Sequence, residues 1–127
     1  MNRKIHLWAI VSGAMAAMCF LLLQGVASSG SAAEMIYVQR DGCPWCKVVD
    51  TTVVPIWNKT EEGRRAPLRR VDSDAAWPED LKDITPERLT PTFILVEDGE
   101  EIARLRGYPG EHFIWPMITE MVGKLPQ

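Results

Sequence analysis

The chain has 127 residues, which leaves room for one domain. It carries 14 basic and 17 acidic side chains, a formal net charge of −3 at pH 7. This acidic balance argues against a nucleic-acid partner.

The first third of the chain has the pattern of a secretory signal peptide. A basic pair at residues 3–4 precedes an apolar stretch over residues 7–23, and small residues follow. We expect cleavage after Ala33, so that residues 1–33 form the leader and residues 34–127 form the mature domain.

The apolar stretch is long for a signal peptide, and a membrane anchor needs about 20 apolar residues. An uncleaved anchor over residues 7–26 is therefore the alternative. In both cases the folded domain faces an oxidising compartment. The basic residues Arg3 and Lys4 leave with the leader, so 12 basic side chains remain against 17 acidic ones.

The mature part opens with an apolar run at residues 35–38, and we predict a buried strand over residues 35–40, ended by the turn Asp41-Gly42. The sequence Cys43-Pro44-Trp45-Cys46 comes next and starts a stretch with apolar residues near helical spacing, up to about residue 59. Pro55 should kink or end this helix.

The later segments are short, and Gly63 with the arginines after it predicts a loop. The elements expected beyond it are a strand over residues 68–71, a brief helix over 78–84, a buried strand over 91–97, a hairpin turn at Asp98-Gly99 with a returning strand through 102–105, and an amphipathic closing helix over 113–125. We expect Phe113 and Met117 to belong to the apolar side of that closing helix. The order β-α-β-α-β-β-α predicts an α/β fold.

The two cysteines of the mature domain have the spacing of a thiol–disulfide exchange site. A helix N-terminus stabilises a thiolate, so Cys43 at the start of the predicted helix should be the attacking, partly exposed sulfur. Cys46 lies about one turn further in, where it can attack a mixed disulfide at Cys43 and release the product. Pro44 takes the first helical position, where its missing N–H costs no hydrogen bond.

A structural disulfide and a metal site are the alternatives. A disulfide across so short a loop would stabilise the fold by only about 2 kcal/mol. A zinc site needs four ligands, and the mature chain offers Cys43, Cys46 and His112 as soft or imidazole ligands.

The segment Thr90-Pro91-Thr92 stands just before the predicted buried strand. Together with the upstream Cys-x-x-Cys motif, it resembles the thioredoxin-like superfamily. The resemblance implies a central mixed β-sheet flanked by helices and a cis peptide bond at Pro91, facing the cysteine pair. It also implies that the backbone of Thr90 pairs with an extended client peptide.

A closer resemblance joins four segments that occur in this order: residues 43–47, 62–68, 89–95 and 107–111. Together they look like the small secreted thioredoxins called SoxS, of bacterial sulfur-oxidation clusters, and the likeness spans residues 36–122. It implies a periplasmic thiol–disulfide oxidoreductase that keeps the cysteine of a sulfur-carrier partner reduced. By the same resemblance Gly107 and Tyr108 line the groove beside the cysteine pair.

One position departs from the family pattern. Many thioredoxins place a buried acid six residues before the first cysteine, where this chain has Tyr37. The base that takes the proton of Cys46 is therefore unassigned, with Asp41 or water as candidates.

The sequence thus predicts a monomeric, periplasmic oxidoreductase that acts through a Cys43–Cys46 disulfide and needs no bound cofactor. Pro44, Trp45, Thr90, Pro91, Gly107 and Tyr108 are the predicted client-binding residues. The expected partners are a protein with a reactive cysteine or disulfide and a membrane conduit that imports thiol reductant. A disulfide oxidase or isomerase, a metal-binding chaperone and a non-catalytic adaptor stay open as alternatives.

Overall fold

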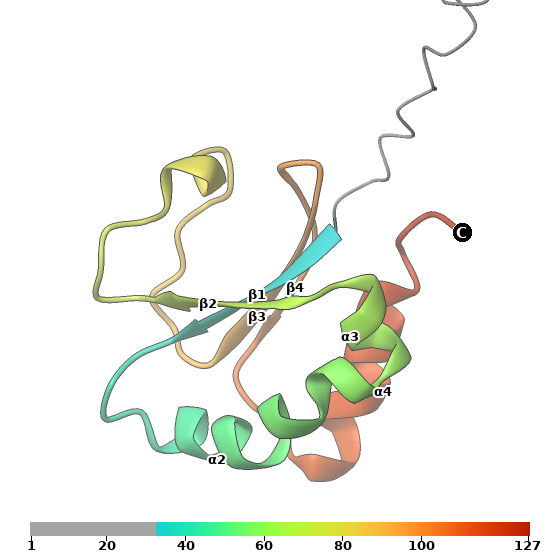
Figure 1. The fold of residues 1–127 in the computed structure, drawn as a ribbon. Helices are drawn as coiled ribbons and strands as arrows, with labels where there is room; N and C mark the ends of the chain where they lie inside the picture. The colour runs from blue at the N-terminus through green and yellow to red at the C-terminus, as the bar shows by residue number, and fades with distance from the viewer. Residues whose placement is uncertain (1–32) are drawn as a thin grey trace, which may run out of the picture. The chain divides into compact units, whose positions relative to one another are not determined.

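A four-stranded sheet in the order β2-β1-β3-β4 forms the centre of the fold in the computed structural model, which describes residues 33–127 (Figure 1). The strands are β1 (Ala33–Gln39), β2 (Leu68–Asp72), β3 (Thr92–Glu97) and β4 (Glu100–Arg106). β1 and β2 run parallel, whereas β3 is antiparallel to both β1 and β4, so the sheet is mixed as expected. The predicted leader lies outside the described residues, apart from Ala33.

The helical segments lie on the two faces of this sheet. They are α2 (Pro44–Thr52), the 3-10 helix η2 (Val54–Lys59), α3 (Glu61–Arg65), the 3-10 helix η3 (Glu79–Leu81) and α4 (Glu111–Val122). α2, α3 and α4 cover one face, and the segment that contains η3 covers the other (Figure 1). Within residues 33–127, no helix is long and apolar enough to cross a bilayer.

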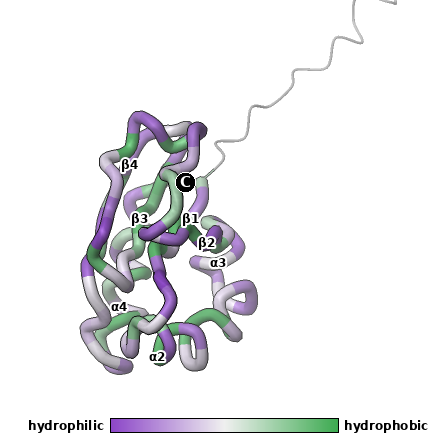
Figure 2. The backbone as a smooth tube through the Cα atoms, turned by 90° about the vertical axis from the view of Figure 1, so that its left-hand side faces the viewer, coloured by the Kyte–Doolittle hydropathy of each residue, from purple (hydrophilic) through white to green (hydrophobic). Residues whose placement is uncertain are grey.

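The central strand β1 supplies both hydrophobic cores, because successive side chains of a strand point to opposite faces. Met35 and Tyr37 belong to the core under α2 and α4, and Ile36 and Val38 to the core on the η3 side. In Figure 2 the hydrophobic residues, coloured green, therefore follow β1 and β3 inside the domain. A strand that is buried on both faces fits the continuous apolar run read from the sequence.

The helix after the cysteine motif ends at Thr52 and gives way to η2, which has Pro55 in its first turn. The prediction that Pro55 ends or kinks this helix is confirmed. The brief helix expected over residues 78–84 is the single 3-10 turn η3.

The loop predicted at Gly63 is wrong, because the structure has the short helix α3 there. Thr60 caps this helix, since its hydroxyl accepts a hydrogen bond of 3.0 Å from the N–H of Gly63. Gly63 itself packs against the preceding 3-10 helix so closely that an added Cβ would lie 1.9 Å from the carbonyl oxygen of Trp57. The glycine is thus required by a close approach of two backbones rather than by a flexible loop.

The hairpin predicted at Asp98-Gly99 is confirmed, with positive φ angles of 51° and 83° at its two turn residues.

The closing helix α4 forms, but Phe113 and Met117 are exposed rather than buried. Ile114 and Ile118 define the buried side instead. Phe113 and Met117 each precede one of these residues by one position, a rotation of about 100° around the helix, which carries them toward solvent.

Candidate active site

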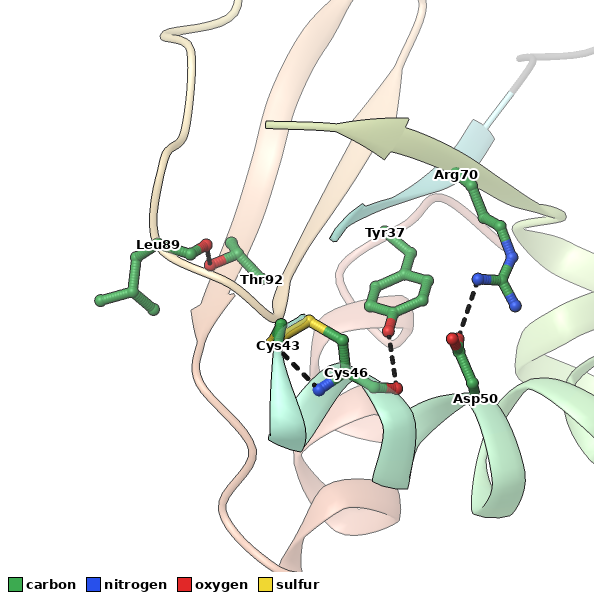
Figure 3. Close-up of a disulfide and its surroundings, with 7 residues drawn as sticks. All are labelled: Tyr37, Cys43, Cys46, Asp50, Arg70, Leu89 and Thr92. Carbon is green, nitrogen blue, oxygen red and sulfur yellow. Dashed lines mark hydrogen bonds and ion pairs between the residues drawn. A yellow bond between two sulfur atoms is a disulfide. The ribbon is translucent and has the colours of Figure 1, made fainter. Parts of the chain in front are cut away.

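Cys43 and Cys46 form a disulfide at the N-terminus of α2, with their Cα atoms 5.2 Å apart (Figure 3). Cys43 is the N-cap residue and is partly exposed, whereas Cys46 is only 2 % exposed. Pro44 is the first residue of the helix and is exposed. The pair thus presents one sulfur to solvent and keeps the other inside, the arrangement expected from the sequence.

The helix terminus supplies a hydrogen bond to the outer sulfur. The N–H of Cys46 has no carbonyl partner inside the helix, and it donates to Sγ of Cys43 at 3.1 Å. The same donor and the positive end of the helix dipole would stabilise a thiolate at Cys43 once the disulfide is reduced.

The loop before β3 passes beside this disulfide. Its Thr90–Pro91 peptide bond is cis, as the resemblance implied, and Pro91 is buried. Figure 3 shows the segment from Leu89 to Thr92 running close to Cys43, with the Thr92 hydroxyl donating to the Leu89 carbonyl at 2.8 Å. Thr90 immediately precedes Pro91 in this segment, and its pairing with a client stays a prediction.

Trp45 and Tyr108 meet at the surface of the site. Trp45 is 59 % exposed, and its ring centroid lies 6.0 Å from that of Tyr108 in a stacked arrangement. Gly107 precedes Tyr108 with a positive φ of 82° and donates its N–H to the carbonyl of Pro91 at 2.7 Å. The structure therefore brings the predicted client-binding residues around one disulfide, and their roles in binding stay predictions.

Tyr37 lies next to the pair, fully buried, and its hydroxyl donates to the carbonyl of Cys46 at 3.2 Å (Figure 3). Burial raises the pKa of the Tyr37 phenol well above its usual range, and the negative charge of the Asp50 carboxylate raises it further. The guanidinium of Arg70 pairs with Asp50 at 2.8 Å and lies 5.4 Å from the centre of the Tyr37 ring. The phenol is therefore held in its protonated form.

Asp50 and Arg70 were missed by the sequence reasoning, which named Asp41 or water as base for Cys46. Asp41 is exposed in the turn before α2, whereas Asp50 lies beside the Tyr37 hydroxyl. The spacing held a signal, because Asp50 follows Cys46 by four residues and so shares its side of the helix. Arg70 had no such signal in the sequence, because only the parallel register of β1 against β2 in the structure pairs it with Tyr37.

The alternative of a metal site at the cysteine pair requires at least one further ligand beside the two sulfurs. Within residues 33–127, no three side chains of His, Cys, Asp or Glu are grouped so that they could hold a metal ion. His112 is exposed in the first turn of α4 and does not join Cys43 and Cys46 in such a group.

No protein-family model matches the chain, and no curated protein sequence matches it. Solved structures do. The periplasmic thioredoxin SoxS from Paracoccus pantotrophus, in its reduced form, is 35% identical, with a TM-score of 0.67 over 72% of this chain and 97% of that chain. Thioredoxin-2 of the malaria parasite is 22% identical, with a TM-score of 0.53 over 71% of this chain and 84% of that chain.

A mutant thioredoxin from Halobacterium salinarum is 21% identical, with a TM-score of 0.54 over 75% of this chain and 79% of that chain. At this level of identity, it and the malarial protein support the fold alone. The similarity to the Paracoccus protein extends over nearly the whole of that protein.

Proposed function

Because the chain belongs to the thioredoxin family and is a thiol–disulfide oxidoreductase, we propose that it acts in the periplasm as a reductase of protein disulfides. The observation that carries this proposal is the asymmetry of the Cys43–Cys46 disulfide at the start of α2. A partly exposed sulfur at a helix N-terminus can attack a client, and a buried sulfur one turn later can release it.

The proposed reaction has two exchange steps. The Cys43 thiolate attacks one sulfur of a client disulfide, forms a mixed disulfide and expels the first client thiolate. Cys46, once deprotonated, attacks Sγ of Cys43, expels the second client thiolate and leaves the Cys43–Cys46 disulfide. The client gains two electrons and two protons, and the enzyme must be reduced again before the next turnover.

Client binding would use the segment beside the disulfide. An extended peptide would pair with the backbone of Thr90 next to Pro91, in the manner of an added strand. The exposed ring of Trp45, stacked on Tyr108, offers an apolar surface next to the attacking sulfur.

The proposed reductase function also suggests a compartment and partners. The Paracoccus relative is described as periplasmic, and the predicted leader of this chain suits export. A reductase in an oxidising compartment needs electrons from across the membrane, so we propose a membrane thiol-reductant conduit as its donor. A sulfur-carrier protein with a reactive cysteine is the proposed client, and the enzyme would act as a monomer.

The first test is the reduction potential of the Cys43–Cys46 pair in defined thiol buffers. A value near or below about −250 mV, close to that of thioredoxin, supports a reductase. A value above about −180 mV would mean that the reduced enzyme is the stable form, and the function would then be that of an oxidase or isomerase.

A trapping experiment identifies the client. Cys46→Ser removes the resolving sulfur, so the client should remain bound to Cys43 as a mixed disulfide that dithiothreitol releases. The matched control is the double variant that also carries Cys43→Ser, which should trap nothing. A periplasmic extract of the native host that yields no trapped protein with Cys46→Ser would count against the exchange mechanism.

A further inference from the structure

Glu87 is a buried carboxylate that the exchange chemistry does not use. It lies in the loop between η3 and β3 and is 9 % exposed. Its Oε2 atom pairs with Nη1 of Arg104 at 3.0 Å and with Nε of Arg106 at 2.6 Å, and both arginines come from β4. Its Oε1 atom accepts hydrogen bonds of 3.0 Å from the N–H groups of Arg88 and Leu89.

These bonds tie the loop to the edge of the sheet. Arg104, whose side chain is 8 % exposed, also donates from Nη2 to the carbonyl of Thr85 at 2.9 Å. At the other end of the loop, the carbonyl of Pro91 accepts from the N–H of Gly107, just after β4. Between these two ties, the carboxylate of Glu87 is the group that connects the loop backbone to β4.

The tied segment is the one that carries the proposed client-binding backbone. Leu89 and Thr90 lie two and three residues after Glu87. The N–H of Leu89 donates to Oε1 of Glu87, and the carbonyl of Leu89 accepts from the hydroxyl of Thr92. The Leu89 side chain points out to solvent and is exposed (Figure 3). The backbone that would pair with a client is therefore held in place by the hydrogen bond from the Leu89 N–H to Glu87.

Burying a charged cluster of this kind costs desolvation energy, and an apolar side chain could fill the same space. Such clusters are weak evidence for stability, but their directional bonds can select one backbone arrangement. A function in positioning the loop accounts for both the burial of Glu87 and the direction of its bonds.

We propose that Glu87 is a positioning residue that holds the Leu89–Pro91 segment in the shape needed to pair with an extended peptide client. The inference rests on the proposed reductase function. It predicts that Glu87 matters for disulfides carried by a polypeptide and not for small disulfides, which have no backbone to pair.

The test compares two substrates in single turnover. Pre-reduced enzyme is mixed with excess insulin or with excess 2-hydroxyethyl disulfide, and its oxidation is followed by tryptophan fluorescence. With insulin, we expect the second-order rate constant of Glu87→Ala to fall about tenfold or more, because misplaced binding groups lose much of their effect. With 2-hydroxyethyl disulfide, the rate constant should stay within about twofold, because the sulfur chemistry is unchanged.

Two further variants sharpen the test. Glu87→Gln keeps an acceptor for the Leu89 N–H but loses the charge, so its rate constant with insulin should lie between those of the wild type and Glu87→Ala. If Glu87→Ala does not fold, Glu87→Gln is compared with the wild type in its place. Glu101→Gln is the matched control, because Glu101 also pairs with Arg104, at 2.6 Å, and has no bond to the loop. Its insulin rate should equal that of the wild type.

A folded Glu87 variant that reduces insulin at the wild-type rate, or that loses equal activity on both substrates, would overturn the positioning role. A wild-type enzyme that reduces neither substrate would instead overturn the proposed reductase function, so the two failures are distinct.

Discussion

Tyr37 stands where many thioredoxins have a buried acid, and its chemistry at that position is different. Burial and the neighbouring Asp50 raise the pKa of the phenol well above its usual range, so it is a donor and not a base near neutral pH. Its hydroxyl donates a hydrogen bond to the carbonyl of Cys46, and this bond links β1 to α2, the helix that carries the cysteine pair. The residue thus anchors the inner cysteine through its hydroxyl.

Tyr37→Phe should keep the ring packing and remove the hydrogen bond to Cys46. We expect a loss of about 1 kcal/mol in the free energy of unfolding, the usual contribution of one hydrogen bond. Urea denaturation of the oxidised protein measures it. Tyr108→Phe is the control, since its partly exposed ring stacks on Trp45 and the change leaves that ring in place. Equal stability of Tyr37→Phe and the wild type would show that the bond to Cys46 contributes nothing.

At the scale of single elements, sequence patterns predicted the strands better than the short helices. The strands follow from apolar runs, which need no tertiary information, and the hairpin follows from two turn residues. The helix α3 has five residues and a central glycine, so propensity alone favours a loop. It forms because Thr60 caps it and because the backbone at Gly63 lies directly against Trp57. Both contacts depend on the fold around them.

Gly63→Ala tests that close approach. The added methyl group would overlap the carbonyl of Trp57, which is backbone and cannot rotate away, so we expect a loss of about 2–3 kcal/mol or failure to fold. Gly99→Ala is the comparison, because Gly99 has a positive φ of 83° but no atom within 4 Å of the position that an added Cβ would take. Its cost should be limited to about 1 kcal/mol of backbone strain. If thermal unfolding shows equal losses in the two variants, the close packing of α3 on η2 is not what requires the glycine.

The loop that contains Glu87 should make stability depend on acid pH. Burial alone would raise the pKa of this carboxyl, but the N–H of Leu89 and the pairs with Arg106 and Arg104 outweigh it and lower the pKa to about 2. A lowered pKa means that the stabilisation is fully present above about pH 4.5 and is lost as the pH falls toward 2, a change of about 3 kcal/mol.

Urea denaturation between pH 2 and pH 6 measures this change. Other carboxyls also lose bonds in acid, since hydrogen bonds from Thr119 and Arg69 lower the pKa values of Glu62 and Asp80. The informative quantity is therefore the difference between the wild type and Glu87→Gln. That difference should be about 3 kcal/mol at pH 6 and should shrink toward zero at pH 2. A difference independent of pH would mean that the charge of Glu87 is not stabilised by its partners.

For the whole molecule, features formed by residues close together in the sequence could be predicted, whereas contacts between segments far apart in the sequence could not. The cysteine pair, the proline before β3 and the turn at Asp98-Gly99 are local motifs, and together they sufficed for the fold class and for the residues around the disulfide. The network of Tyr37 with Arg70 depends instead on the parallel register of β1 and β2, and that of Glu87 on a loop folded against β4. Such networks join segments whose pairing no single motif reveals.

The redox function ties the active site to the stability of the whole fold. The reduction potential of a folded protein and its resistance to unfolding in the two redox states form a thermodynamic cycle, in which about 30 mV corresponds to 1.4 kcal/mol. A strongly oxidising enzyme has a reduced form that is the more stable one. If this chain is a reductase, its disulfide form should be the more stable, with a higher midpoint in urea than the dithiol form.

Parallel denaturation of the oxidised protein and of protein kept reduced measures the difference without any client. The double variant in which Cys43 and Cys46 are both replaced by Ser should behave like the reduced form, because it cannot form the bond. A higher urea midpoint for the reduced form than for the oxidised form would require the opposite direction of electron flow, from client thiols to the enzyme.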